Sequence, residues 1–187
     1  MLEQQYPKEI LLKDGREVVL KTPDAGDGEA LLEFYRGLSP KDRWFFKEDP
    51  TTPEVIAKWV ANHMEKRAFC VIGFYGTRIV AHAALLLRPE GGRKHVGRLR
   101  VVLATDFRGD RLGTWLVFDL MRRAMELGLE KLRADFVVGI EDAAIEALRR
   151  LDFFEEGLLK DYVRGPDGRY RDYLIMIKHL HREWGDF

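Results

Sequence analysis

Three apolar segments of strand length follow one another in the middle of the chain, at residues 68–75, 79–87 and 95–104. Runs of this kind, without regular polar alternation, are typical of strands that helices cover on both faces of a sheet. None reaches the roughly 18 to 20 apolar residues that a membrane span needs. The three segments therefore predict a layered α/β protein and no membrane partner.

The flanking segments supply further strands and the covering helices. Asp14-Gly15 between two β-branched runs predicts a hairpin over residues 9–22. Thr52 and the proline after it predict the start of a helix. The remaining expectations are helices at 27–38, 112–127 and 142–151, a loop at 39–52, a strand at 131–138, and a hairpin at 158–180 that turns at residues 165–168.

Charge and cysteine content exclude several classes of function. Lys plus Arg and Asp plus Glu are both 31, so the formal net charge is zero and no global field favours nucleic acid or an anionic membrane surface. Cys70 is the only cysteine, which excludes an intrachain disulfide and a cysteine zinc cage, and we expect it to be buried. No residues have metal-ligand spacing, and the N-terminus lacks the pattern of a signal peptide, so we expect no metal and a cytoplasmic location.

The most informative segment is residues 101–114, where an apolar strand passes through a glycine-bearing turn directly into an amphipathic helix. This geometry leaves the first helical N–H groups unpaired at the positive end of the helix dipole, an arrangement that binds phosphate. Gly109 and Gly113 would let a diphosphate approach the backbone, and Arg108 and Arg111 would add positive charge. The alternative is an ordinary strand–helix turn. The pattern is neither a P-loop nor a clean GxGxxG turn.

The same segment resembles motif A of the GNAT acetyltransferases, in which an apolar strand leads to Arg/Gln-x-x-Gly-x-Gly/Ala and a helix. Arg108 and Gly113 match the motif, and Gly109 is a common addition. Arg111 stands where the family usually has its middle glycine. Its Cβ could crowd the phosphates or its guanidinium could pair with them, and we favour pairing.

A second resemblance lies downstream, to the family's motif B, Asn-x-x-Ala-Ile-x-x-Tyr-x-x-x-Gly-Phe. Ala144, Ile145 and Phe153 match, while the Asn, Tyr and Gly positions hold Glu141, Leu148 and Asp152. The likeness covers about residues 68–180. Residues 31–40 are also weakly similar to the acetyltransferase domain of bacterial protein-lysine acetyltransferases.

The resemblance implies an α/β fold with a mixed, twisted sheet of six or seven strands and helices on both faces, as a single domain over residues 1–187. It implies transfer of an acetyl or related acyl group from acetyl-CoA directly to an amine. In this family the strand before the glycine turn carries a bulge and splays from its neighbour, so that backbone contacts the pantetheine arm. By position, the cofactor-binding residues are Val101, Val102 and Leu103 for the pantetheine arm, and Arg108, Gly109, Asp110, Arg111, Leu112, Gly113 and Thr114 for the diphosphate.

The usual catalytic positions of the family are altered. Leu148 replaces the tyrosine that acts as acid, and Arg98 and Arg100 occupy the strand where many relatives carry a carboxylate base. The resemblance offers substitutes on or near the C-terminal hairpin, each with a purely structural alternative: Tyr162, Tyr173, the neighbouring Asp161 and Asp172, and Glu141, which either caps a helix or lies near the cofactor.

The sequence leaves the roles of a histidine and an aromatic cluster open, and with them the function. His82 is expected to be a hydrogen-bonded core residue, with proton transfer as the alternative. The aromatic residues 44–46 are expected to form core or lid packing rather than a substrate cage.

A CoA-binding module without catalysis is the main rival function, followed by a nucleotide-binding protein. The sequence does not distinguish a small-molecule amine from a protein amine as the acceptor. We expect no nucleic-acid partner. A homodimer is considered because members of the family often dimerise.

Overall fold

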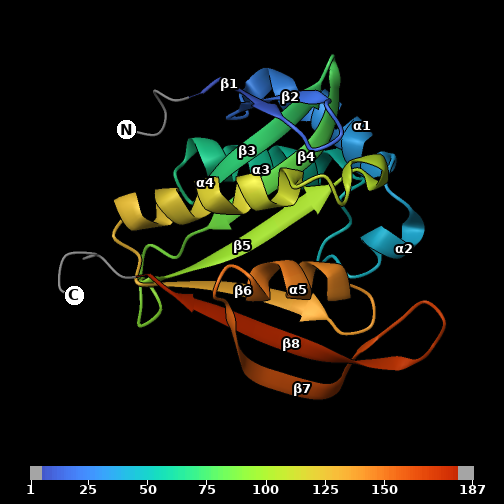
Figure 1. The fold of residues 1–187 in the computed structure, drawn as a ribbon, viewed down its shortest axis with the longest axis vertical. Coiled ribbons are helices and arrows are strands. Elements are labelled where there is room, and N and C mark those ends of the chain that lie inside the picture. Colours follow the sequence, from blue (N-terminus) through green and yellow to red (C-terminus); the bar gives the residue numbers. More distant parts are fainter. Residues whose placement is uncertain (1–5, 181–187) are drawn as a thin grey trace.

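One eight-stranded sheet organises the protein in a computed structural model that describes residues 6–180. The strand order is β1-β2-β3-β4-β5-β6-β8-β7 (Figure 1). Neighbouring strands are antiparallel except for β5 and β6, which are parallel. The sheet is mixed, as expected, but the predicted count of six or seven strands is too low. Both terminal hairpins join the sheet, one at each edge.

The elements alternate along the chain much as the hydrophobic pattern predicts. The strands are β1 (Lys8–Leu11), β2 (Glu17–Lys21), β3 (Ala68–Tyr75), β4 (Arg78–Leu86), β5 (Val96–Leu103), β6 (Lys131–Val137), β7 (Phe154–Arg164) and β8 (Tyr170–His179). The α-helices are α1 (Gly28–Arg36), α2 (Pro40–Arg43), α3 (Pro53–Met64), α4 (Leu112–Glu126) and α5 (Asp142–Arg149). Two 3₁₀ turns, Ala25–Asp27 and Thr105–Phe107, precede α1 and α4.

Local chemistry explains the boundaries. The Asp14-Gly15 turn closes the first hairpin, with Gly15 at a φ of 87° and the Leu12 N–H donating to the Arg16 carbonyl at 2.8 Å. The predicted loop 39–52 contains the short helix α2, because the Ser39 hydroxyl accepts from the Asp42 N–H and Pro40 occupies the first turn. The C-terminal hairpin starts at Phe154 rather than at the predicted residue 158.

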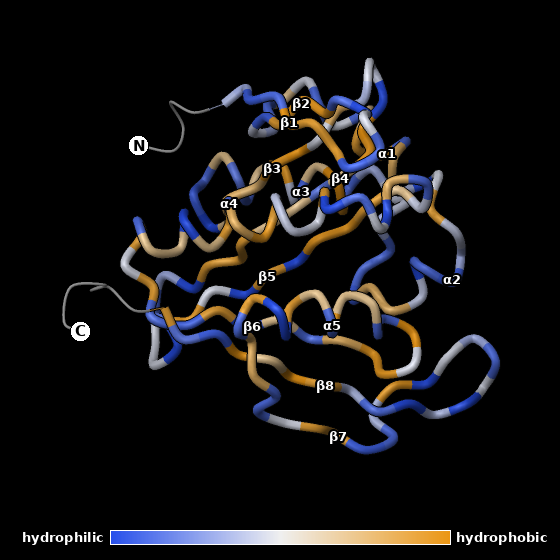
Figure 2. Tube along the Cα trace, in the orientation of Figure 1, coloured by the Kyte–Doolittle hydropathy of each residue, from blue (hydrophilic) through white to orange (hydrophobic). Residues whose placement is uncertain are grey.

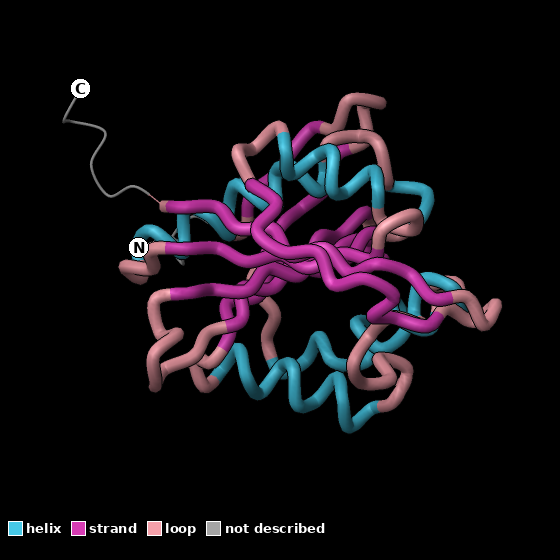
Figure 3. Tube along the Cα trace, turned by 90° about the horizontal axis from the view of Figure 1, so that it is seen from below, coloured by secondary structure: helices cyan, strands magenta, loops and turns pink. Residues whose placement is uncertain are grey.

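Helices cover the sheet on both faces, as Figure 3 shows. On one face, α4 and α5 pack against the strands through Leu116, Leu120 and Ile145. On the other, α1 and α3 form a second cluster that contains Leu31, Ile56 and Trp59. Side chains alternate between the two faces along β5, so Leu99 belongs to the first cluster and Val102 packs against the second.

Hydropathy follows these layers. The central strands are the most hydrophobic part of the trace, and the tip of the β7–β8 hairpin is hydrophilic (Figure 2). Cys70 is buried, as expected. Within residues 6–180, no helix combines the length and the apolar character that crossing a membrane requires.

Candidate functional site

The parallel strands β5 and β6 separate halfway along their length. They pair only from Val96 opposite Lys131 to Arg98 opposite Arg133, and the ribbons then diverge (Figure 1). On its other edge β5 stays paired with β4 as far as Leu103 opposite Ala81, without a register shift. The expected bulge in β5 is therefore wrong, and the splay comes from the divergence of β6. The β6-facing edge of residues 99–103 pairs with no other strand of the described chain, which leaves backbone groups for a ligand.

The junction between β5 and α4 exposes a series of backbone donors. The N–H groups of residues 109–114 donate to no protein acceptor within the described residues, and the first bond of α4 runs from the Trp115 N–H to the Arg111 carbonyl at 3.1 Å. Gly109 has a φ of 92° and Arg111 a φ of 68°, so the chain curls before the helix starts. Successive N–H groups in such a curl, with a helix dipole behind them, form an anion-binding concavity.

The glycines leave room beside these donors. A Cβ on Gly109 would meet nothing within 4 Å, and one on Gly113 would lie 3.4 Å from the Leu103 side chain. The site therefore has the donors and the open space that a diphosphate needs. Arg111, at the position where the family usually has glycine, adopts the left-handed conformation that glycine favours.

The polar side chains at the junction are partly committed to protein partners. Arg108 pairs with Asp42 at 3.2 Å and also donates to the Leu103 carbonyl at 3.3 Å. Asp110 accepts from Arg16 at 3.3 Å. Arg111 is exposed and has no side-chain partner among residues 6–180. It is therefore the junction arginine whose charge is available to a ligand.

A polar cluster lies on one face of the sheet where β5 and β6 separate. Asp135 on β6, with only 2% of its side chain exposed, pairs with Arg98 at 2.7 Å and with Arg133 at 2.6 Å. Arg98 also donates to the hydroxyl of Tyr173 at 3.4 Å. Burial raises the pKa of Tyr173, and the charge of Asp135 adds to the rise against the opposing effect of Arg98. Sequence reasoning missed Asp135, although the polar residue inside an apolar strand was a signal for it.

Glu141 occupies the N-cap position of α5, but its side chain does not cap that helix. It turns back and accepts from the Val137 N–H at 2.7 Å, at the end of β6. Burial raises the pKa of Glu141 against the opposing effect of the Val137 hydrogen bond, and the charges of Asp135 and Asp42 add to the rise. The structure thus places a desolvated carboxyl group near the separation of β5 and β6.

The two hairpin tyrosines differ in their environment. Tyr173 on β8 is half-buried and lies opposite Val137 of β6. Tyr162 on β7 is 63% exposed, and its ring centre lies 5.5 Å from that of Tyr173. Asp161 has a φ of 51° in an irregular part of β7, and its N–H donates to Asp172 at 3.0 Å. Asp172 also pairs with Lys160 at 2.7 Å, so the two aspartates serve the hairpin itself.

An aromatic cluster packs beside this polar cluster on the same face. His82 is 3% exposed, and its Nδ1 lies 2.7 Å from the Tyr35 hydroxyl. Burial lowers the pKa of His82 to about 3, so the ring is neutral at ordinary pH. The expectation of a hydrogen-bonded core histidine is confirmed. The rings of Phe46 and Trp59 lie nearby with their centres 6.3 Å apart, and the guanidinium of Arg100 lies over both rings, at 5.7 Å and 4.9 Å from their centres.

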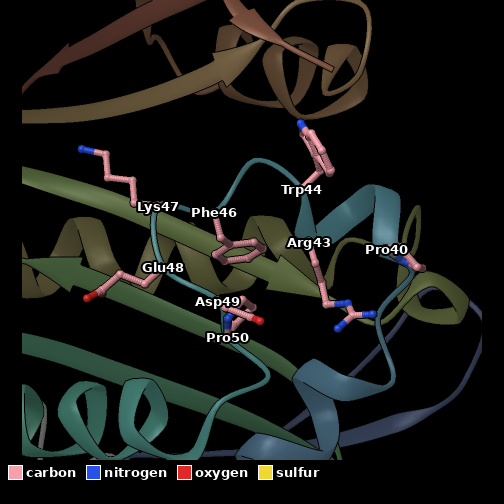
Figure 4. Close-up of a pocket in the computed structure, with 8 residues that line it drawn as sticks. All are labelled: Pro40, Arg43, Trp44, Phe46, Lys47, Glu48, Asp49 and Pro50. Atoms are coloured by element: carbon pink, nitrogen blue, oxygen red, sulfur yellow. The ribbon is translucent and has the colours of Figure 1, made fainter. Parts of the chain in front are cut away.

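The segment after α2 passes along the mouth of this region. Figure 4 shows a hollow that the segment lines, with Phe46 and Lys47 on the β5 side and Trp44 directed away from them. The Trp44 indole N–H donates to the Arg164 carbonyl at 2.8 Å, which ties the segment to the β7–β8 hairpin. Phe46 therefore belongs to the packing of the second core cluster, while the exposed Trp44 joins this segment to the β7–β8 hairpin.

Comparison with protein families identifies a match over most of the chain. The model of the acetyltransferase (GNAT) family matches residues 31–153. This range includes the β5–α4 junction and the helix that follows β6. Among curated proteins no match is found.

Solved structures with the same fold are numerous. A ribosomal-protein-alanine N-acetyltransferase from Brucella melitensis is 26% identical with a TM-score of 0.75, over 86% of this chain and 99% of that chain. A phosphinothricin acetyltransferase from Sinorhizobium meliloti, in complex with acetyl-CoA, is 21% identical with a TM-score of 0.75, over 91% and 92% of the two chains. The Salmonella typhimurium protein yncA, also with acetyl-CoA, is 16% identical with a TM-score of 0.75, over 91% and 98%.

Proposed function

The chain belongs to the acetyltransferase (GNAT) family, and on that basis we propose that it transfers an acetyl group from acetyl-CoA directly to the nitrogen of an amine. The observation that carries the proposal is the row of unpaired N–H groups at residues 109–114, next to the β5 edge that β6 leaves open. The solved neighbours from Sinorhizobium meliloti and Salmonella typhimurium hold acetyl-CoA, in agreement with this assignment. We further propose that the whole chain, 1–187, is one domain.

The backbone would hold the co-substrate. The N–H groups of Gly109, Asp110, Arg111, Leu112, Gly113 and Thr114 would bind the diphosphate, with the dipole of α4 behind them. The open edge of β5, including Val101 and Val102, would pair with the amides of the pantetheine arm. Arg108 would position the turn through Asp42 and Leu103, and Arg111 would add a guanidinium.

The reaction needs orientation and two proton transfers. The amine nitrogen bonds to the acyl carbon of the thioester while the carbon–sulfur bond breaks, the amine loses a proton and the leaving thiolate takes one. We propose Tyr173 as the acid, because burial raises its pKa and keeps its hydroxyl protonated. We propose Glu141 as the base, because burial raises its pKa above that of an ordinary carboxyl group and so makes it a stronger base. Tyr162 is the weaker candidate because of its exposure.

The acid is tested by a matched pair of substitutions, Tyr173→Phe and Tyr162→Phe. Loss of a general acid should lower kcat by on the order of 10²-fold, with KM for acetyl-CoA unchanged. We expect this loss for Tyr173→Phe and less than about a threefold change for Tyr162→Phe. The opposite order of effects would transfer the role to Tyr162, and no effect in either variant would exclude both.

The overall activity is tested with purified protein, acetyl-CoA and a panel of amines. Thiol release that depends on the amine, with a mass increase of one acetyl group on it, is the expected result. Calorimetry with CoA measures binding independently. If CoA binds and no amine in the panel causes thiol release, the proposed transfer is refuted and a non-catalytic CoA-binding module takes its place. Two features favour that second function: Leu148 stands at the position of the usual tyrosine, and Arg98 and Arg100 occupy the strand that usually carries the carboxylate.

A further inference from the structure

Arg100 is an unpaired guanidinium in the middle of β5. It is partly buried and contacts the faces of Phe46 and Trp59. Within residues 6–180 it has no hydrogen bond or ion pair to any protein acceptor. Burial lowers the pKa of Arg100. The charges of Tyr35 and Glu48 oppose this shift, and the charge of Arg98 adds to it. A guanidinium has five donors, and partial desolvation without an acceptor is costly, so the position is suited to an anionic ligand.

Charged side chains of both signs surround Arg100. Arg98, Arg133 and Lys47 lie around the separation of β5 and β6, and Asp135 is the carboxylate that both arginines share. The charge of Arg98 is the largest cause that lowers the pKa of Lys47, and the charge of Asp135 opposes it. Two further acids lie near this region: Glu48 is held by Lys58 at 2.6 Å and by the Trp59 indole at 3.4 Å, and Glu141 accepts from the Val137 N–H.

Arg100 is the guanidinium of this region that has no carboxylate partner among the described residues. An acceptor amine is itself cationic in water, so Arg100 would repel an acceptor that carried no other charge. An anionic group on the same molecule removes that penalty. A carboxylate or a phosphorus oxyanion can also accept two parallel hydrogen bonds from one guanidinium.

Resting on the proposed acetyl transfer, we infer that the acceptor is a small amine that carries a carboxylate or a phosphorus oxyanion, and that Arg100 binds this anion. Two tethers favour a small molecule over a polypeptide. The Trp44 indole is bonded to the Arg164 carbonyl at 2.8 Å, and Asp42 is paired with Arg108 at 3.2 Å. Residues 42–44 are thus held to both sides of the region, and Figure 4 shows Phe46 below the loop that follows them, with the Lys47 side chain extending away from Trp44.

The test compares matched acceptors that differ in charge alone. Free amino acids and aminoalkylphosphonates are paired with the corresponding amino-acid amides and phosphonate diesters, and a set of short peptides is the third arm. We expect kcat/KM to be at least about tenfold higher for the anionic member of a pair, the size of one charge-assisted contact. The series with the higher kcat/KM, carboxylate or phosphonate, identifies the anion that Arg100 binds. A preference for the neutral members, or for peptides over free amino acids, would overturn the inference.

Substitution of Arg100 separates recognition from packing. Arg100→Gln should lower kcat/KM for the anionic acceptors by about tenfold or more, mainly through KM, and change that for the neutral acceptors by less than about twofold. Arg100→Lys, which keeps the charge, should recover part of the loss. The control is Arg122→Met, at an exposed arginine of α4 on the opposite face of the sheet. It should change kcat/KM for neither the anionic nor the neutral acceptors. An equal loss for both acceptor classes would assign Arg100 to structure alone and overturn the inference.

A second readout guards against a variant that folds poorly. A carboxylate or phosphonate without an amine should inhibit the wild-type enzyme competitively against the acceptor, and lack of inhibition counts against the anion site.

Failure of this inference and failure of the proposed function give different results. Acetylation of neutral amines with no preference for anionic ones refutes this inference and leaves the proposed function intact, whereas CoA binding without thiol release from any amine refutes the proposed function.

Discussion

Arg111 offers the sharpest test of how the β5–α4 junction binds CoA. Its φ of 68° is a conformation that costs a residue with a Cβ about 1 kcal/mol. Glycine would relieve that strain but adds about 0.5 to 1 kcal/mol of unfolded-state entropy, so Arg111→Gly should leave the stability within about 1 kcal/mol of the wild type. Arg111→Ala removes the guanidinium and keeps the strain. The two variants therefore separate the charge from the backbone.

The expected effect on affinity follows from the exposure of the side chain. A guanidinium that pairs with a phosphate near the surface contributes on the order of 1 to 1.5 kcal/mol, or about five- to tenfold in Kd. We expect this loss for CoA in both variants, measured by calorimetry, and a smaller loss at 0.5 M salt because an exposed pair is screened. Dephospho-CoA keeps the diphosphate, so its affinity should fall by the same factor in both variants.

The outcomes assign the contact. If CoA loses affinity and dephospho-CoA does not, Arg111 binds the terminal 3′-phosphate rather than the diphosphate. The reasoning is refuted if Arg111→Ala binds CoA as tightly as the wild type, since the guanidinium then contributes nothing. Tighter binding by Arg111→Gly alone would mean that the Cβ of Arg111 crowds the phosphates. Arg122→Ala, at an exposed arginine of the same helix, is the control.

Two predictions concern the core. The pKa of His82 in the fold is about 3, below its usual 6.5, so the unfolded chain binds the extra proton as the pH falls below 6.5. Stability should drop by about 1.4 kcal/mol per pH unit from 6.5 downward, and urea unfolding of His82→Phe should show a slope smaller by that amount. A Cβ on Gly97 would lie 2.6 Å from Leu85 Cδ1 and 2.8 Å from Leu129 Cδ1. Gly97→Ala should therefore destabilise the protein by about 1 to 3 kcal/mol, and an unchanged melting temperature would contradict the packing.

The order of elements could be predicted because each one carries its own local signal. Asp14-Gly15 marks the first turn, Gly128 follows the end of α4, and the apolar runs mark the central strands. The residue patterns even contained all eight strands, although the family resemblance implied fewer. The short helix α2 was missed because four residues give no periodicity, and its cap and proline resemble a loop.

The polar cluster could not be predicted in the same way. Asp135 and Arg98 lie on strands that α4 separates in the chain, and no local pattern fixes the register of a parallel pair joined by a long crossover. The position of Glu141 was also ambiguous, because a carboxylate before a helix predicts a cap. Its bond to the Val137 N–H exists only because β6 ends beside it.

The register of β5 and β6 also explains why one arginine is left free. Arg98 lies opposite Arg133 at the last paired position, and both reach Asp135 two residues further along β6. Arg100 lies two residues beyond that position, where β6 no longer accompanies β5 and where the carboxylate of Asp135 is already paired with Arg98 and Arg133. A one-residue shift of the strands would turn these side chains to the opposite face. The same divergence that opens the β5 edge to a ligand therefore also leaves Arg100 without a protein partner, so the backbone site and the proposed anion site have a common structural origin.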